Sequence, residues 1–243
     1  MSAAGRPQGD AAVRRTTGRG QHVPPPAMAP GKARADAVGQ TRAAPWTAFF
    51  DRDGVFNLHK VPGVTRLGQF EWLPGAAQAF ARLNRPDVQT CLCTNQPTVG
   101  HLMATPGMVR RVNGHLQSGL EAAGGRLDRV EAAFSPVWFP HRRRKPRPGM
   151  LQDGARWLGK HRTPVDPARA SMVGDTLKDA QAANAFGCKA ILVATTHPRS
   201  WLEERARAAG VHVDAFCDDL PAAVEVILGW IDRAGRTDSG NPK

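Results

Sequence analysis

Short apolar segments alternate with amphipathic helical patterns along most of the chain, and this alternation restricts the fold more than any other feature. The apolar segments lie at residues 46–50, 88–93, 130–134, 170–173 and 190–193, with a weaker sixth at 211–216. The helical patterns lie at about 75–84, 107–122, 148–160, 177–186, 199–209 and 219–231. Apolar strands that alternate with helices are typical of a parallel sheet covered on both faces. The sequence therefore predicts a doubly wound, Rossmann-like α/β domain with five to six parallel strands.

Composition divides the 243 residues into a tail, a domain and a stub. Residues 1–44 are rich in Gly, Pro, Ala and Arg and have no helical or strand periodicity, so we expect a disordered basic tail. Residues 45–233 carry the alternating pattern and form the predicted domain, and residues 234–243 form a short, flexible C-terminal stub. This division fits a single domain of about 150–200 residues.

An excess of positive charge restricts the partners of this chain. There are 33 Lys and Arg against 21 Asp and Glu, which gives a formal net charge of +12. Nucleic acid and a phosphorylated small molecule are both suitable partners for this charge, although a coding bias toward Arg would give the same balance without any ligand. No apolar run reaches the roughly 18–20 residues of a membrane span, which excludes a bilayer-spanning protein.

The four cysteines are too few and too scattered for a disulfide framework or a four-ligand zinc site. They are Cys91, Cys93, Cys188 and Cys217. We expect free thiols in a reducing environment, and hence a cytoplasmic location, with Cys91 and Cys93 as small buried side chains of a strand.

Polar clusters follow four of the predicted strands, at the edge of the sheet where α/β proteins place their sites. Asp51 and Asp53 come directly after the first strand and share a side of the chain, because side chains at i and i+2 of an extended segment do so. Gly54 then allows a sharp turn. Two close carboxylates repel each other unless a cation or a proton lies between them. Taken alone, this pattern is equally typical of a solvated acidic turn.

The other three clusters offer groups that bind anions or a metal. Residues 94–96 (Thr-Asn-Gln) follow the second strand and can donate hydrogen bonds to phosphoryl oxygens, although such residues also begin ordinary loops. A basic run at residues 142–147 precedes a predicted helix whose N-terminus favours anions, and its alternative is a solvated basic loop. Asp175 and Asp179 follow the fourth strand and supply the oxygen ligands that Mg²⁺ prefers.

Together, and in this order at successive strand ends, the four clusters resemble the motifs of the haloacid dehalogenase (HAD) superfamily of phosphotransfer enzymes. The matching residues are Asp51-Arg52-Asp53-Gly54, Thr94, Lys145, Gly174-Asp175 and Asp179. The resemblance covers roughly residues 45–230 and implies a HAD-like fold. Predicted helices and strands fill the segments between the motifs, which leaves no room for a cap domain. The wording of the motifs is most similar to the capless branch, subfamily IIIA, which contains heptose bisphosphate phosphatases and histidinol phosphatases.

The resemblance implies a role for each matching residue. Asp51 would be the nucleophile that forms an aspartyl phosphate, and Asp53 would protonate the leaving oxygen and then activate water. Mg²⁺ would be bound by Asp51, Asp175 and the backbone carbonyl of Asp53. The remaining implied roles are phosphoryl binding by Thr94 and Lys145, orientation of Lys145 or a metal-bound water by Asp179, substrate binding by Asn95, Gln96, Arg144 and Lys145, and support of the site by Gly54 and Gly174.

Two segments depart from the branch that the sequence resembles. Members of that branch often carry a Cys and His zinc loop before the Arg-Lys-Pro segment, whereas residues 135–141 contain no Cys, and we therefore predict no zinc. Residues 97–101 replace the usual Ser-Gly and basic residue after Thr-Asn-Gln. The resemblance thus implies the phosphoryl chemistry and leaves the substrate open.

The leading hypothesis is a Mg²⁺-dependent phosphomonoesterase that acts on a small phosphorylated metabolite, such as a sugar bisphosphate or histidinol phosphate. The alternative is a nucleic-acid 3′-phosphatase, because an open site, an Arg cluster and a basic tail would suit a DNA end. The absence of Tyr and of a stacking motif weighs against it. A noncatalytic binding protein with this fold is the least favoured hypothesis, since every catalytic position is intact.

Overall fold

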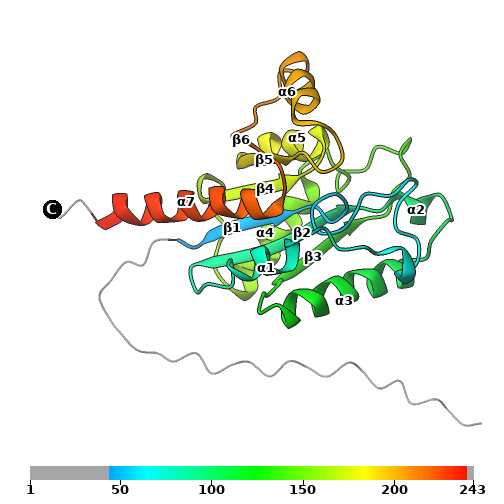
Figure 1. The fold of residues 1–243 in the computed structure, drawn as a ribbon, viewed down its shortest axis with the longest axis horizontal. Coiled ribbons are helices and arrows are strands. Elements are labelled where there is room, and N and C mark those ends of the chain that lie inside the picture. The colour runs from blue at the N-terminus through cyan, green and yellow to red at the C-terminus, as the bar shows by residue number, and fades with distance from the viewer. Residues whose placement is uncertain (1–43, 240–243) are drawn as a thin grey trace, which may run out of the picture. The chain divides into compact units, whose positions relative to one another are not determined.

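Residues 44–239 are the part of the chain that this computed structural model describes, with side chains through residue 236 (Figure 1). Six strands form one sheet in the order β3-β2-β1-β4-β5-β6, and all neighbouring strands are parallel. The strands are β1 (Trp46–Phe50), β2 (Val88–Asn95), β3 (Arg129–Ala133), β4 (Ala170–Gly174), β5 (Lys189–Val193) and β6 (Ala215–Cys217). The predicted doubly wound α/β fold is confirmed.

The helices also follow the predicted alternation. They are α1 (Ala76–Ala81), α2 (Pro97–Gly100), α3 (Pro106–Ala122), α4 (Gly149–His161), α5 (Leu177–Phe186), α6 (Arg199–Ala208) and α7 (Leu220–Ser239), with 3-10 turns η1 (Leu67–Gln69) and η2 (Pro167–Arg169). No separate cap domain interrupts residues 44–239, because these elements occupy the segments between the predicted motifs.

One helix and two boundaries differ clearly from the prediction. The short helix α2 has only four residues, too few to produce a periodic pattern in the sequence. β6 begins at Ala215, later than predicted, because the backbone N–H of Val211 still donates to Ala206 and so belongs to the end of α6. α7 continues to Ser239, into the segment predicted to be a polar stub. The predicted tail lies outside the described residues except for Ala44.

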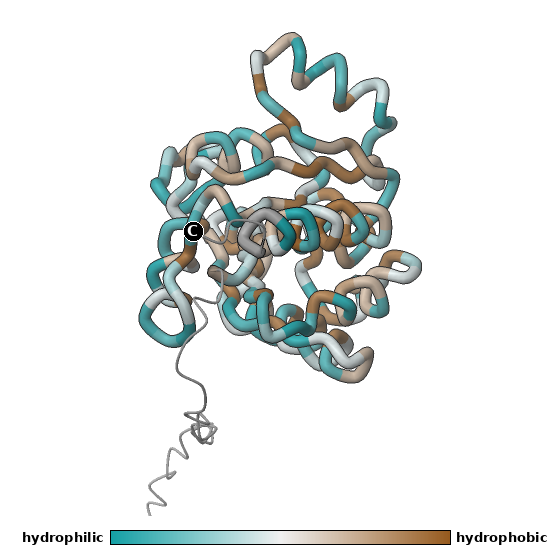
Figure 2. The backbone as a smooth tube through the Cα atoms, turned by 90° about the vertical axis from the view of Figure 1, so that its left-hand side faces the viewer, coloured by the Kyte–Doolittle hydropathy of each residue, from teal (hydrophilic) through white to brown (hydrophobic). Residues whose placement is uncertain are grey.

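Alternate residues of each strand contribute to two separate cores. Phe50 belongs to the core beneath α1, α3 and α7, whereas its neighbour Phe49 belongs to the core beneath α4, α5 and α6. Brown, hydrophobic stretches of the backbone tube lie mostly in the interior in Figure 2, and teal, hydrophilic ones lie mostly at the outside. All four cysteines are buried, as predicted for Cys91 and Cys93. None of the helices that the structure describes is both long and apolar enough to cross a membrane.

The strand order places the carboxyl ends of β1, β2 and β4 next to one another. β1 pairs with β2 on one side and with β4 on the other, so the chain changes direction across the sheet at β1. A sheet with such a reversal forms a crevice at this point. The loop after β1 is fixed over the crevice by Phe56, whose ring lies 5.6 Å from that of Phe50 and 5.4 Å from that of Phe80.

Candidate active site

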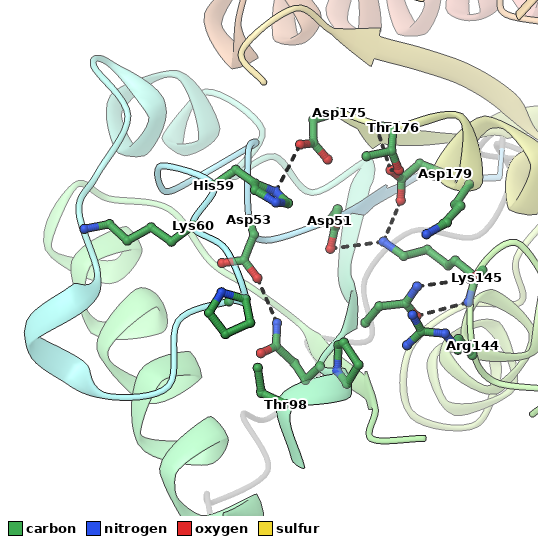
Figure 3. A pocket seen from close by; sticks show the side chains of 16 residues that line it. Asp51, Asp53, His59, Lys60, Thr98, Arg144, Lys145, Asp175, Thr176 and Asp179 are labelled. Atoms are coloured by element: carbon green, nitrogen blue, oxygen red, sulfur yellow. Dashed lines mark hydrogen bonds and ion pairs between the residues drawn. The ribbon is translucent and has the colours of Figure 1, made fainter. Parts of the chain in front are cut away.

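A cavity of about 150 Å³ opens at the carboxyl ends of β1, β2 and β4 (Figure 3). Every cluster that the sequence predicted contributes residues to its lining. The lining residues are Asp51, Asp53, His59, Lys60, Pro62, Gly63, Asn95, Gln96, Pro97, Thr98, Arg144, Lys145, Asp175, Thr176, Lys178 and Asp179. Residues from three strand ends and from two loops, at 59–63 and 144–145, therefore meet in one site.

Two glycines allow the acidic side chains to approach the backbone. Gly54 has φ +79°, and a Cβ at this position would lie 2.1 Å from Oδ2 of Asp175. A Cβ on Gly174 would lie 2.2 Å from Cβ of Asp179. Any side chain at either position would displace a carboxylate of the site, which explains the glycines at these two predicted supporting positions.

Arg52 and Asp53 form a buried ion pair beside the cavity. Arg52 is fully buried, and its Nη2 donates to Oδ2 of Asp53 at 2.9 Å while its Nη1 donates to Oδ1 of Asn113 at 2.9 Å. Asp53 also accepts hydrogen bonds from Asn57 and Gln96, each at 2.8 Å. Burial by itself would raise the pKa of Asp53, but the charge of Arg52 and these hydrogen bonds outweigh it and hold the pKa below its ordinary value. The carboxylate is thus ionised at neutral pH.

Lys145 lies between two carboxylates at the bottom of the cavity. Its Nζ is 3.0 Å from Oδ1 of Asp51 and 2.6 Å from Oδ1 of Asp179, and its side chain is 1% exposed. Burial would lower the pKa of Lys145, but the charges of Asp179 and Asp51 raise it above its ordinary value, so the ammonium stays protonated. Asp179 is itself fixed, because its Oδ2 accepts from the N–H and the hydroxyl of Thr176 in the capping box of α5.

Three carboxylates converge where a metal ion would fit. Ligand oxygens of Asp51, Asp175 and Asp179 all lie within 4.8 Å of one another. The pKa of Asp51 is raised to about 7, mainly by burial. Lys145 opposes this rise, and the charges of Asp179, Asp175 and Asp53 add to it. A dense group of buried oxygen ligands whose charges destabilise one another suits a divalent cation such as Mg²⁺.

The three polar residues after β2 lie close together but contact different groups. Asn95 uses both atoms of its amide on the backbone of Lys145: its Nδ2 donates to the carbonyl at 3.0 Å and its Oδ1 accepts from the N–H at 3.1 Å. Gln96 bridges Oδ2 of Asp53 and the hydroxyl of Thr94, at 2.8 and 3.0 Å. Thr94 is fully buried and is not among the residues that line the cavity. Asn95 therefore positions Lys145. Fewer of these three residues are available to bind phosphoryl oxygens than the sequence suggested.

The basic run separates into two groups. Arg142 donates to Asp153 of α4 at 3.0 Å, and Arg143 pairs with Glu131 of β3 and with Asp153. Arg144 instead lines the active-site cavity, where its Nη1 donates to the carbonyl of Ser135 at 3.2 Å. Two arginines of the run are therefore paired with carboxylates, and Arg144 is the one of the three that lines the cavity.

Sequence reasoning did not identify several residues of the site. His59 lies with its Nδ1 3.6 Å from Oδ2 of Asp175, and the hydroxyl of Thr196 donates to the same oxygen. The contact with Asp175 raises the pKa of His59, against the effect of its partial burial. Asn57 and Asn113 complete the network around Arg52 and Asp53. Only Asn57 lay close enough to the first motif for the sequence to have suggested it.

Known proteins with similar sequences are phosphatases. The HAD-hydrolase-like family matches residues 142–223. The D-glycero-beta-D-manno-heptose-1,7-bisphosphate 7-phosphatase of Bordetella bronchiseptica is 34% identical over 184 residues, which cover 73% of this chain and 95% of that protein. The D-glycero-alpha-D-manno-heptose-1,7-bisphosphate 7-phosphatase of Mycobacterium tuberculosis is 36% identical over 154 residues, 60% of this chain and 76% of that protein.

Solved structures show the same fold. The D,D-heptose 1,7-bisphosphate phosphatase of B. bronchiseptica, complexed with magnesium and phosphate, superimposes with a TM-score of 0.68 at 31% identity and covers 76% of this chain and 99% of its own. A putative HAD-like phosphatase of Mesorhizobium loti gives a TM-score of 0.58 at 27% identity over 79% of this chain and 91% of its own. The chain belongs to the haloacid dehalogenase superfamily of phosphatases, within the group related to heptose bisphosphate phosphatases.

Proposed function

We propose that this phosphatase is a Mg²⁺-dependent phosphomonoesterase that works through an aspartyl phosphate on Asp51. The observation that carries the proposal is the convergence of Asp51, Asp175 and Asp179 around one point, with Lys145 Nζ 3.0 Å from Asp51. A nucleophilic carboxylate, an acidic cation site and a fixed ammonium are the parts that phosphoryl transfer through an enzyme carboxylate requires.

Asp51, Asp175 and the backbone carbonyl of Asp53 would hold Mg²⁺ in this proposal, with the fourth nearby oxygen, from Asp179, committed to Lys145. The metal would neutralise negative charge on the phosphoryl oxygens. Its presence in the related B. bronchiseptica structure supports this assignment. We predict no zinc, since residues 135–141 offer no thiolate.

In the first step a carboxylate oxygen of Asp51 attacks phosphorus, the ester P–O bond breaks, and the leaving oxygen takes a proton from Asp53. The pKa of Asp53 is below its ordinary value in the free site. A bound phosphate dianion would raise this pKa, so that Asp53 takes up the proton that it later donates from solvent as the substrate binds. In the second step Asp53 takes a proton from water, the water oxygen attacks phosphorus, and the bond to Asp51 breaks. Lys145 stabilises the oxygens in both steps and stays charged throughout.

The proposed substrate is a small phosphorylated metabolite, such as a sugar bisphosphate or histidinol phosphate. The related enzymes are named for heptose bisphosphates, which supports a sugar phosphate as the first substrate to test. All the residues of the proposed site lie between residues 51 and 179, inside the predicted domain at 45–233. Arg144 lines the cavity and would bind a second anionic group of the substrate.

Phosphate release from a metabolite panel tests this proposal. Wild type with Mg²⁺ is expected to hydrolyse at least one member, while Asp51→Asn and wild type in a chelator are expected to be inactive. Equal inertness of wild type and Asp51→Asn across heptose, histidinol and oligonucleotide phosphates would overturn it.

A further inference from the structure

The two segments that depart from the pattern of related enzymes lie against each other in the fold. His101, at the end of α2, accepts a hydrogen bond at its Nε2 from the N–H of Val137, 3.3 Å away, and its ring centroid is 4.6 Å from that of Trp138. A Cβ on Gly100 would lie 2.5 Å from the backbone nitrogen of Pro136. Residues 97–101 and 135–141 thus form one wall, with His101 holding the Trp138 ring.

This wall presents aromatic surface to solvent beside the active site. The side chain of Trp138 is 70% exposed and that of Phe139 is 56% exposed. Both line a second cavity of about 410 Å³, which shares Arg144, Lys145 and Lys178 with the cavity that contains Asp51. A substrate whose phosphoryl group lies at Asp51 would therefore extend its leaving group along these rings.

The charges around the second cavity complement an anion. Arg144, Arg147 and Lys178 line it, and none of the three has a carboxylate partner among residues 44–236, in contrast to Arg142 and Arg143. Exposed aromatic rings combined with unneutralised cations are the arrangement by which proteins bind a base and its phosphates.

The polarity of the lining disfavours a polyhydroxylated leaving group in this cavity. Of the described side chains that line it, none is a carboxylate, an amide or a hydroxyl group. The hydroxyl groups of a sugar need acceptors as well as donors, whereas the cations only donate and His141 is the one described side chain of this lining that could accept. A leaving group with a planar ring and a second anionic group fits this lining better, because the ring can stack on Trp138 and the anion can bind the cations.

We infer that this phosphatase acts on nucleotides: phosphate esters whose leaving group carries a nucleobase, which stacks on Trp138 and Phe139, and a further phosphate, which is bound by Arg144, Arg147 and Lys178. The inference rests on the proposed function and names its substrate class. The same chemistry occurs in a free nucleoside bisphosphate and in the 3′-phosphorylated end of a single-stranded oligonucleotide, and the experiment below separates the two.

Steady-state kinetics compare adenosine 3′,5′-bisphosphate with ribose 3,5-bisphosphate, which keeps both phosphates and lacks the base. The expected kcat/KM is at least about tenfold higher for the nucleotide, since base stacking contributes roughly this factor or more. Trp138→Ala is expected to bring the ratio of the two values toward one, and Trp138→Phe to restore most of it. A ratio near one in wild type, or a ratio that Trp138→Ala leaves unchanged, would overturn the inference.

Trp201→Ala is the matched control. Trp201 is also exposed and also stacks on a histidine, His197, with centroids 4.1 Å apart, but it lies on α6. This variant is expected to keep the wild-type ratio. A 3′-phosphorylated oligonucleotide hydrolysed faster than the free nucleotide would assign the site to nucleic-acid ends, and the reverse order to free nucleotides.

Binding to Asp51→Asn distinguishes the inference from the proposed function. Calorimetric titration of this variant with the same two bisphosphates measures stacking without turnover. Tighter binding of the nucleotide by Asp51→Asn supports the inference even if wild type releases no phosphate, provided that the preference is lost when Trp138→Ala is added to Asp51→Asn. Equal binding of both compounds refutes it even if wild type hydrolyses both.

Discussion

The ammonium of Lys145 lies 2.6 Å from the carboxylate of Asp179, and both side chains are 1% exposed. A buried ion pair of this kind is costly to break, because removal of one charge leaves the other without compensation. The pair joins the loop before α4 to the first turn of α5, so it holds the proposed phosphate-binding lysine against Asp51.

Asp179→Asn is expected to lower both stability and activity. The free energy of unfolding should fall by about 2–4 kcal/mol, measured by urea denaturation, and kcat should fall because Lys145 loses one of its two carboxylate partners. Glu203→Gln is the control, since it breaks the exposed pair with Arg199 and should cost less than about 0.5 kcal/mol. Equal effects of the two variants would contradict the role of the buried pair.

The pKa of Asp51 predicts how stability depends on pH in the metal-free protein. This pKa is 3.8 in an ordinary carboxyl group and about 7 in the folded protein. The folded state therefore binds the proton more tightly than the unfolded state, and this contribution to stability is present below pH 4 and is lost as the pH rises through 7. Above pH 7 the ionised carboxylate disfavours folding.

Asp51→Asn should consequently stabilise the protein at pH 8 in a chelator, by about 1–3 kcal/mol. The two proteins should differ less at pH 4, where the carboxyl group is protonated in the folded state and already partly protonated in the unfolded state. Urea unfolding at the two pH values measures the difference. A variant that is less stable than wild type at pH 8 would show that Lys145 outweighs the repulsion among the acidic groups.

Asn57→Ala should move the pH profile of turnover. Asn57 donates to Oδ1 of Asp53 at 2.8 Å and helps to hold the pKa of that carboxyl below its ordinary value. Loss of this donor should raise the pKa, so the acidic limb of log kcat against pH should shift upward by about half a unit to one unit. An unshifted limb would mean that the ionisation of Asp53 does not control turnover at low pH.

Arg144→Ala should weaken substrate binding, whereas Arg142→Ala should not. Arg144 lines the cavity, while Arg142 pairs with Asp153 on the surface of α4. The first variant should raise KM for a bisphosphorylated substrate by about 10- to 100-fold, the value of a charge-assisted hydrogen bond. The second should stay within about twofold of wild type. Similar KM values for both variants would show that the two arginines are equivalent.

The alternation of apolar segments with helical patterns was sufficient to predict the parallel sheet and the order of its helices, because the four central strands β1, β2, β4 and β5 are buried on both faces. The same pattern placed Asp51 and Asp175 directly after two strands, which the fold brings side by side, whereas Lys145 reaches them from the loop before α4. The pattern did not predict α2, because a helix of four residues is too short to show a helical periodicity in the sequence. Partners far apart in sequence, such as Arg52 with Asn113 or Asp175 with Thr196, follow from tertiary packing alone.

Charge was harder to interpret than hydrophobicity. The run at residues 142–147 is uniform in sequence, but Glu131 and Asp153 neutralise two of its members and leave Arg144 and Arg147 beside the cavities. The stacking surface at Trp138 was missed for a related reason. Its partner His101 is 37 positions earlier in the chain, and nothing in the local sequence indicates that the two rings meet.

Chemical trapping of the phosphorylated enzyme tests the central claim most directly. The enzyme is quenched during turnover, reduced with borohydride, which converts an acyl phosphate to an alcohol, and digested for mass spectrometry. The account predicts homoserine at position 51 in the turnover sample and unmodified Asp51 in a sample without substrate. Turnover with an unmodified Asp51, or with the modification at Asp53, would contradict it.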